Sequence, residues 1–423
     1  MIGFREAQAA VLETAGEPLG VESIALETAL GRVAAQAVVA KTDLVAFARS
    51  AMDGYAVRTA DTLRANAEDR LRLEVVQTLF AEAGSATHRP GTATGIATGT
   101  PIPHGADAVI PFELVERDGN TIEISAPARV GENVFPPGED AHAGEQIVAV
   151  GQTLTPASLG LAGVAGSAQI SVFVRPRVAI VSTGDELVEI GEEPQHGQVR
   201  NSNAPMLATM VRDAGGDVVA VRKVADVPAA LRDALAQALE EADLVITTGG
   251  ASAGPRDFVK ATLRELGVRF AFESIALRPA RPTGFGRRER TLVAVLPGNP
   301  AAAFVGFAEF VRPALLRIAG FETVLYPEVP AILEGDIHAK ATRTYLVFGS
   351  LRHDGGRFVA NPIVNQCSAI VRTAADANCL IVLEPREGTL ETGDSVAVHV
   401  LDWNRVAFSS VAPTPRREPA RLR

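Results

Sequence analysis

The chain has 423 residues, of which 47% are hydrophobic and only 5% aromatic, and its formal net charge is −10. This length predicts two to four domains, whose cores must consist mainly of Ala, Val and Leu. The acidic balance argues against nucleic-acid and membrane-surface binders, because such partners attract basic patches. We therefore expect neither a nucleic acid nor a membrane among its partners.

The cysteines and the N-terminus bear on the cellular compartment. Cys367 and Cys379 lack C-x-x-C spacing, so we expect no disulfide framework and no zinc site. Residues 1–16 carry Arg5 and Glu6 and no apolar core run, unlike a signal peptide. No stretch approaches the ~20 apolar residues of a membrane span. These features predict a soluble, cytoplasmic protein.

The first third of the chain predicts a helix followed by short strands. Residues 2–16 have the apolar spacing of an amphipathic helix, and residues 19–43 contain short β-branched runs around a turn at Gly31. From Leu44 to about Gly144, short alternating runs are punctuated by Gly and Pro, which is typical of a small β-rich unit.

Between Arg175 and Gly320 the pattern changes to alternating strands and helices. The expected strands are RVAIVS, DVVAVRKV, DLVITT and TLVAVL, and the expected helices are APMLATMVRDAG, VPAALRDALAQALEEA and PAAAFVGFAEFVRPALLRIAG. This order predicts an α/β domain with a largely parallel sheet covered on both faces. From Phe321 onward, strand-like runs with Gly-rich turns predict a small β-barrel or sandwich, and the chain from Val406 indicates a disordered basic tail.

Three of the predicted parallel strands end in conspicuous turns, which start at Thr183, Gly249 and Pro297. The carboxyl ends of parallel strands meet at one edge of a sheet, where ligands bind in open α/β folds. Glycines there allow backbone N–H groups to approach a ligand, and helix N-termini favour anions. We therefore expect one anion-binding site built from the three turns.

Residues Gly250–Gly254 spell G-x-S-x-G, the pattern of a hydrolase nucleophile elbow with Ser252 as nucleophile. No HGGG-like loop precedes this segment, and the downstream histidines at 338, 353 and 399 fall in the C-terminal β-rich region. A phosphate-binding glycine loop is the favoured interpretation. A metal at this site would use carboxylates such as Asp185, Glu186 and Asp257, which suit Mg²⁺.

Seven segments in register resemble one family, the molybdopterin molybdenumtransferases of the MoeA type, which are similar to the E-domain of gephyrin. They are SAMDGYAVR at 50–58, IATGTPIPHGADAVI at 96–110, PPGEDAHAGE at 136–145, STGDEL at 182–187, GQVRNSNAPML at 197–207, ITTGGASAGPRDF at 246–258 and LPGNPAAAF at 296–304.

The resemblance implies an elongated homodimer with a multidomain α/β plus β fold and an active site between the subunits. The implied parts are an N-terminal helix over 1–19 packing on the α/β domain, a linking domain over 20–43 and 144–172, a β-rich domain over 44–143, a MogA-like three-layer α/β molybdopterin-binding domain over 173–322, a C-terminal β-barrel over 323–402, and a tail over 403–423.

The implied reaction inserts molybdenum from molybdate into adenylylated molybdopterin, releases AMP and uses Mg²⁺. The implied partners are a MogA-type adenylyltransferase and acceptor molybdoenzymes. By motif position, the catalytic residues are Asp53, Thr98, Asp140, Glu186 and Asp257, of which Asp53, Glu186 and Asp257 also hold the metal. The substrate-binding residues are Thr183, Gly184, Asp185, Asn201, Ser202, Gly249, Gly250, Ser252, Gly254, Arg278, Arg281, Pro297, Gly298 and Asn299.

Two positions depart from the family pattern. Asn201 stands where the family commonly has Asp, and an amide supplies no negative charge. Arg278-Pro279-Ala280-Arg281 replaces a Lys-Pro-Gly-Lys segment, which keeps the charge but loses a glycine. A catalytically weakened paralogue that binds or delivers molybdopterin is therefore an alternative to the transferase, and a serine hydrolase using Ser252 is a third hypothesis.

Overall fold

The computed structural model describes residues 1–82, 84–250, 258–339, 342–385 and 388–408, and the chain divides into two compact units. The first unit comprises Met1–Glu22, Gly31–Ala35 and the chain from Val172 onward, and the second comprises Ser23–Leu30 and Gln36–Ser171. Within the described part of the chain, every helix is too short or too polar to cross a membrane.

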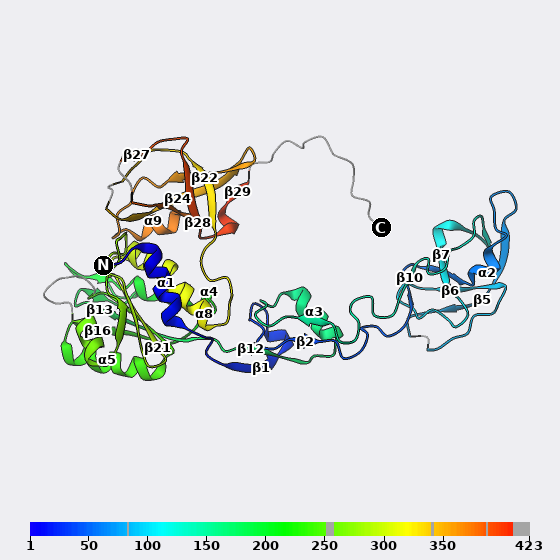
Figure 1. Cartoon of the computed structure of the whole chain (residues 1–423), viewed down its shortest axis with the longest axis horizontal. Coiled ribbons are helices and arrows are strands. Elements are labelled where there is room, and N and C mark those ends of the chain that lie inside the picture. The colour runs from blue at the N-terminus through cyan, green and yellow to red at the C-terminus, as the bar shows by residue number, and fades with distance from the viewer. Residues whose placement is uncertain (83, 251–257, 340–341, 386–387, 409–423) are drawn as a thin grey trace. The chain divides into compact units, whose positions relative to one another are not determined.

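The first unit contains a six-stranded sheet, of which four neighbouring strands are parallel (Figure 1). The four parallel strands are the four predicted ones, in the spatial order β16 (Asp217–Val224), β13 (Arg177–Thr183), β17 (Leu244–Thr248) and β21 (Thr291–Leu296). The prediction of a largely parallel sheet is confirmed.

An antiparallel pair extends this sheet, and the sequence did not predict it. Its strands are β20 (Gly284–Arg288), which pairs with β21, and β18 (Arg269–Phe272). A Cβ at Gly286 would lie 2.4 Å from the carbonyl oxygen of Arg269, so the close approach of the strands requires glycine there. Glycine weakens the local strand signal, which is why the hairpin is inconspicuous in the sequence.

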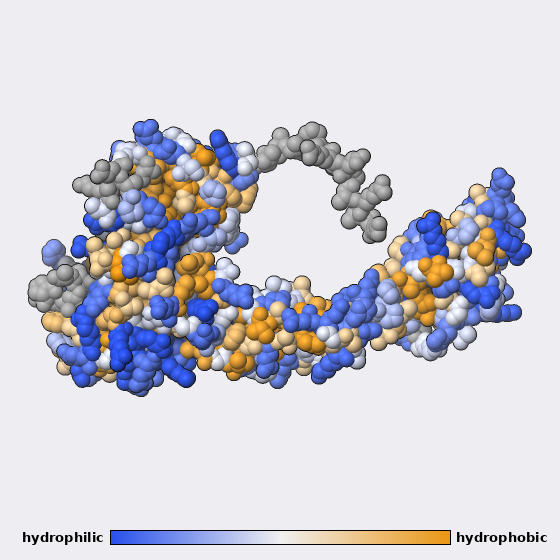
Figure 2. Space-filling view, in the orientation of Figure 1, coloured by the Kyte–Doolittle hydropathy of each residue, from blue (hydrophilic) through white to orange (hydrophobic). Residues whose placement is uncertain are grey.

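Helices cover both faces of the sheet. The helices of this unit are α1 (Phe4–Ala15), α4 (Asn203–Asp213), α5 (Pro228–Glu241), α6 (Val259–Glu265), α7 (Pro300–Gly306) and α8 (Arg312–Ile318). Even-numbered residues of β13 pack with α1, α4, α7 and α8 in one core, and odd-numbered residues pack with α5 and α6 in the other. The outer surface of α5 is hydrophilic (Figure 2). The helix predicted over residues 2–16 is confirmed, and it buries Phe4, Ala7 and Val11.

The long helix predicted after Pro300 is interrupted. A π-helical segment, Phe307–Val311, separates α7 from α8. Pro313 near the start of α8 has no N–H to donate to the preceding turn, and a wider turn accommodates that loss. The segment buries Glu309, whose carboxylate accepts a hydrogen bond from Gln8 Nε2 of α1 at 3.0 Å.

The C-terminal part of the first unit is a closed five-stranded barrel. The strands pair in the order β24 (Thr344–Asp354), β25 (Arg357–Pro362), β22 (Glu328–Leu333), β28 (Ser395–Val400) and β26 (Cys379–Leu383), and β26 pairs back with β24. Beside it lie β19 (Leu277–Arg278), β23 (Ile337–Ala339), β27 (Gly388–Leu390), β29 (Ala407–Phe408), α9 (Val371–Asp376) and a 3₁₀ turn at Trp403–Arg405. Because β19 pairs with the start of β24, the barrel is joined to the α/β domain near Arg278.

The second unit is built around another six-stranded sheet, with a core that includes Tyr55, Leu73 and Ile122. Its strand order is β7 (Ala108–Pro111), β4 (Gly54–Val57), β6 (Thr92–Ile96), β5 (Leu71–Leu79), β9 (Thr121–Ile124) and β8 (Val115–Asp118). The remaining elements of this stretch of chain are β1 (Val21–Ala25), β12 (Gln169–Phe173), β2 (Val38–Val39), β11 (Gln146–Val148), β3 (Arg49–Ser50), β10 (Val134–Phe135), α2 (Thr59–Thr62), α3 (Pro156–Val164), and 3₁₀ turns at Leu26–Thr28 and Phe112–Leu114.

Candidate functional site

The turns that follow β13, β17 and β21 converge at the carboxyl edge of the sheet. A cavity of about 460 Å³ is lined by Thr183, Glu186, Gly249 and Gly298, together with residues 199–203 at the start of α4. The three strands are direct neighbours in the sheet, so their turns necessarily lie side by side. As the sequence predicted, the three turns lie at one edge of the sheet, where they border one cavity.

Gly249 is the position at which two of these turns touch. Its φ is +91°, and a Cβ there would lie 2.1 Å from the carbonyl oxygen of Thr183. A Cβ on Gly298 would lie 3.4 Å from the Cα of Gly249. The backbones of all three turns are therefore packed against one another, which is possible because glycine has no side chain.

A second cavity of about 380 Å³ shares Thr183, Glu186 and Gly249 with the first and is also lined by Asp226 and Gly250. The Thr183 hydroxyl donates to Asp226 Oδ1 at 2.5 Å. Asp226 was not among the predicted site residues, although it follows β16, another of the parallel strands, and the rule used for the other turns applies to it.

Asp185 has a structural role in this arrangement. Its Oδ1 accepts a hydrogen bond from the backbone N–H of Asp226 at 3.0 Å. It thereby holds the turn after β16 against the turn after β13, and it lines neither of the two cavities within the described part of the chain.

Asn201 and Ser202, which precede α4 and were predicted to bind substrate, line the first cavity, as does Asn203, the first residue of α4. Asn201 is buried, and its Oδ1 accepts the backbone N–H of Ala204 at 3.3 Å. An amide oxygen performs this capping function as well as a carboxylate oxygen does. The change from Asp to Asn at this position is therefore compatible with the same local structure.

A third cavity, of about 210 Å³, contains Arg278, Arg281 and Arg343, with Pro297 and Asn299 at its border with the turns. Within the described residues, none of the three guanidinium groups forms an ion pair with an acid, so their charge is available to an anion. Arg343 comes from the segment before β24 and was not predicted.

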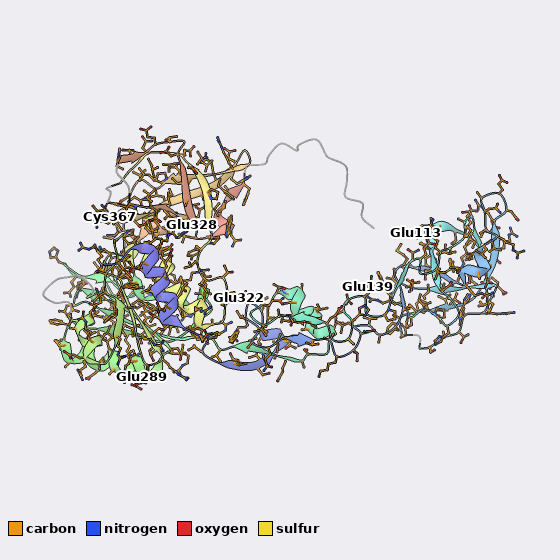
Figure 3. The ribbon with its side chains drawn as sticks, viewed as in Figure 1. Glu113, Glu139, Glu289, Glu322, Glu328 and Cys367 are labelled. Carbon is orange, nitrogen blue, oxygen red and sulfur yellow. The ribbon has the colours of Figure 1, made fainter. Side chains whose placement is uncertain are left out.

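The loop that carries two of these arginines keeps a conformation typical of glycine. Ala280 has a φ of +77°, a conformation that glycine adopts without strain. Asn299 Nδ2 donates to Ser368 Oγ at 3.2 Å, which connects the turn after β21 to the chain between β25 and α9. Cys367, the neighbour of Ser368, is labelled in Figure 3.

Asp53, Thr98 and Asp140 belong to the second unit. Asp53 Oδ1 accepts hydrogen bonds from the backbone N–H of Thr98 at 2.7 Å and from its hydroxyl at 3.0 Å. The backbone bond and then the hydroxyl bond hold the pKa of Asp53 below its ordinary value, so this exposed carboxylate is charged at neutral pH. Asp140 approaches Arg49 of β3 at 4.0 Å, and Asp53 follows β3 by three residues.

Three predicted site residues, Ser252, Gly254 and Asp257, lie outside the described residues. Within the described residues there is no cluster of three or more His, Cys, Asp or Glu side chains placed to hold a metal ion. Glu186 and Asp226 do line one cavity, and Mg²⁺ is commonly bound by one or two carboxylates together with substrate phosphates. The residues present therefore fit Mg²⁺ if a phosphate-bearing ligand completes its coordination.

Comparison with known proteins covers almost the whole chain. Family models match over residues 2–166 (MoeA N-terminal region, domains I and II), 179–317 (probable molybdopterin binding domain) and 330–401 (MoeA C-terminal region, domain IV). Molybdopterin molybdenumtransferase 2 of Mycobacterium tuberculosis is 36% identical over 387 residues, which are 90% of this chain and 94% of that protein. The chain belongs to the MoeA family.

Other MoeA-family proteins are similar to this chain in sequence and in structure. The molybdopterin molybdenumtransferase of Bacillus subtilis is 34% identical, with 89% of each chain covered. The crystal structure of a molybdopterin biosynthesis MoeA protein from Pyrococcus horikosii superposes with a TM-score of 0.80 and 30% identity, covering 95% of this chain and 99% of that one. The expected MoeA fold, α/β and β-rich domains with a C-terminal barrel, is confirmed.

Proposed function

We propose that this chain inserts molybdenum from molybdate into adenylylated molybdopterin and releases AMP, as a step of molybdenum cofactor biosynthesis. Membership of the MoeA family over 90% of the chain supports the proposal. The structural observation that carries it is the convergence of three glycine turns on cavities that contain Glu186 and Asp226, next to a cavity with three arginines.

The chemistry of this substrate suits the arrangement. Adenylylated molybdopterin contains a phosphoric anhydride, and its cleavage requires positioning and charge neutralisation more than a protein nucleophile. Backbone N–H groups of the turns at Gly249 and Gly298 would bind phosphate oxygens. The hydroxyl of Thr183, which is oriented by Asp226, borders the same space.

Mg²⁺ would supply additional positive charge to the anhydride when bound. Glu186 is our first candidate to hold it, with Asp226 beside it and Asp257 and Asp53 as the other carboxylates implied by family resemblance. Arg278, Arg281 and Arg343 would bind an oxyanion such as molybdate, because guanidinium groups match oxyanion geometry and keep their charge.

Assembly and cellular context are part of the proposal. We expect a homodimer in which the second unit of one subunit supplies Asp53, Thr98 and Asp140 to the turns of the other. We expect the protein to act in the cytoplasm, to receive its substrate from a MogA-type adenylyltransferase and to pass its product to acceptor molybdoenzymes.

The direct test is AMP release from adenylylated molybdopterin by purified protein with Mg²⁺ and molybdate. We expect AMP in proportion to the molybdenum bound to pterin, and we expect E186Q to lose most of this activity. Glu240 lies on the outer surface of α5, so E240Q serves as a matched control. Absence of AMP release under conditions in which the Bacillus subtilis relative is active would refute the transferase function.

The second candidate is a carrier that binds molybdopterin without turnover, and Asn201 motivates it. If the missing carboxylate limits the reaction, N201D should raise turnover several-fold. Because Asn201 Oδ1 already accepts a hydrogen bond from the backbone N–H of Ala204 in the first turn of α4, as an Asp oxygen would, we expect turnover of N201D to remain within about twofold of wild type. A large gain would favour the carrier.

A further inference from the structure

The segment 363–370, which we call the strap, leaves the barrel after β25 and reaches the α/β domain. Ser368 makes the contacts at the far end. Its carbonyl oxygen accepts the backbone N–H of Ala301 in the first turn of α7 at 3.0 Å, and its Oγ accepts Asn299 Nδ2 at 3.2 Å. The strap therefore joins the barrel to the turn after β21.

The side chain of Gln366 attaches the strap to β24. Its Oε1 accepts the backbone N–H of Phe348 at 3.0 Å, and its Nε2 donates to the carbonyl oxygens of Phe348 at 2.9 Å and Ile363 at 2.5 Å. The pairing of β24 with β25 ends at Gly349 and Pro362, so this amide supports β24 where the backbone of the partner strand turns away. Because Phe348 is buried, its N–H needs an acceptor, and Gln366 supplies it.

The three bonds specify an uncharged amide. Both hydrogens of Gln366 Nε2 point to carbonyl oxygens, and Oε1 faces an N–H group, so a flipped amide would place like against like. A glutamate carboxylate would face two carbonyl oxygens with a negative charge, and a methionine side chain would leave all three groups without a strong partner. Glutamine satisfies every group of this clamp.

The same strand also carries the other joint between the barrel and the α/β domain. At the start of β24, Tyr345 pairs with Arg278 of β19, and Arg343 directly precedes the strand. Gln366 holds Phe348 further along the strand. Strand β24 therefore holds two arginines at one point and the strap at another.

Residues from both joints line the third cavity. It contains Arg278, Arg281 and Arg343 and is also lined by Gln366 and Ser368 of the strap. The clamp on β24 thus fixes the strap wall of this cavity relative to the arginines. Without the clamp, the strap would be loosened from β24, and the spacing between its wall and the guanidinium groups would no longer be set.

We propose that Gln366 is a positioning residue for oxyanion binding in the third cavity and acts by clamping the strap to β24. Its amide groups bond within the protein, so it acts through the position of the strap and the arginines. This inference rests on the proposed function, because that function assigns molybdate to the same cavity.

The first experiment titrates molybdate alone into full-length protein by calorimetry. Q366E keeps the shape of the side chain but replaces its donor by an acceptor, and Q366M keeps nearly the same length without strong polar groups. We expect each variant to bind molybdate at least about fivefold more weakly than wild type, the factor that corresponds to one lost hydrogen bond.

Asn378 provides a matched control on the same strand. Its Oδ1 accepts the backbone N–H of Leu351 at 2.6 Å, and its Nδ2 donates to the carbonyl oxygens of Leu351 at 3.0 Å and Arg405 at 2.9 Å. This clamp has the same chemistry, but Asn378 lines none of the three cavities, each taken within the described part of the chain. We expect N378D to lower the thermal midpoint, as Q366E does, and to bind molybdate within about twofold of wild type.

The second experiment uses wild type and needs no substitution. Coupling between two sites is reciprocal, so a clamp that strengthens molybdate binding is itself stabilised by molybdate. Saturating molybdate should therefore slow hydrogen exchange of the Phe348 amide at least about fivefold relative to that of the Leu351 amide. The Leu351 amide corrects for any stabilisation of the whole protein, because Asn378 holds it.

Wild type that binds no molybdate, Q366E and Q366M that bind it as wild type does, or N378D that weakens binding equally would each overturn the inference. An unchanged ratio of the two exchange rates would also overturn it, and this ratio decides the matter if neither Gln366 variant folds. AMP release is measured separately. Protein that shows the expected effects but releases no AMP contradicts only the proposed function, and protein that releases AMP while its Gln366 variants bind molybdate normally contradicts only this inference.

Discussion

Thr183 at the end of β13 donates a hydrogen bond of 2.5 Å to Asp226, which follows β16, and so connects the ends of two parallel strands. The turn after β13 therefore has lateral contacts on both sides, with Asp226 on one and Gly249 on the other. Asp226 also lines the cavity that contains Glu186. The same carboxylate therefore holds the turn after β13 in place and adds negative charge to the cavity.

Substituting Asp226 tests the role of that carboxylate. D226N keeps the shape and a hydrogen-bond acceptor but removes the negative charge beside Glu186. We expect AMP release to fall at least about tenfold and the Mg²⁺ requirement to rise, as measured by titrating Mg²⁺ against the initial rate. D233N on the outer surface of α5 is the control; an unchanged Mg²⁺ requirement in D226N would argue against metal binding here.

The close packing of the turns predicts that Gly249 tolerates no side chain. In G249A the Cβ would meet the carbonyl oxygen of Thr183, and alanine at this φ adds roughly 1 kcal/mol of backbone strain. We expect a thermal midpoint lowered by several degrees and almost complete loss of activity. Gly191 has open space around its Cβ position, so G191A should behave as wild type. Normal stability of G249A would contradict the described contact.

The cavity with three arginines predicts that the use of molybdate depends on their positive charge. R281Q and R343Q each remove one charge, and we expect the molybdate concentration needed for half-maximal rate to rise about tenfold in each. High salt should also raise the molybdate concentration that wild type needs for half-maximal rate, because salt screens the attraction between the arginines and the oxyanion. R290Q, on an exposed turn, is the control. If only the affinity for the pterin substrate changes, the arginines bind its phosphate instead.

The buried pair of His399 and Glu309 predicts a pH dependence of stability. His399 Nδ1 lies 2.8 Å from Glu309 Oε1, and Nε2 lies 3.5 Å from Glu328, which is labelled in Figure 3. Burial acts to lower the pKa of His399, but the hydrogen bond and the charge of Glu309 outweigh it, so the pKa lies above its ordinary value. The pair joins the barrel to the π-helical segment and, through Gln8, to α1.

A raised pKa in the folded state gives a stabilisation that is complete below the unfolded value of about 6.5 and is lost as the pH rises through the folded value. We therefore expect the thermal midpoint of wild type to decline on the alkaline side of neutrality. H399Q should have a lower midpoint at pH 6 and a flatter profile. H196Q, in an exposed loop, is the control and should reproduce the wild-type dependence of the thermal midpoint on pH. If H399Q also reproduced it, the pair of His399 and Glu309 would not be the cause of that dependence.

Much of the α/β domain and its three turns was predictable, because the signals are local. Continuous apolar runs such as RVAIVS and TLVAVL indicate buried parallel strands, and Gly and Pro after them indicate turns at the same sheet edge. The interrupted helix after Pro300 and the hairpin of β18 and β20 were missed. Pro313, which lacks an N–H, accompanies the π-helical interruption, and the close approach of Gly286 to Arg269 in the paired strand accompanies the hairpin.

The sequence by itself determined which four strands form the parallel part of the sheet and that their turns share one edge, since hydrophobic periodicity and glycine punctuation act over a few residues. Tertiary structure alone decided which polar groups meet there. Asn203 reaches Thr248 and Gly298 across 45 and 95 residues of chain, and Arg343 joins Arg278 and Arg281 from beyond the α/β domain. Hydrogen bonds and charges act over a few ångströms in space, and spacing along the chain does not specify those distances.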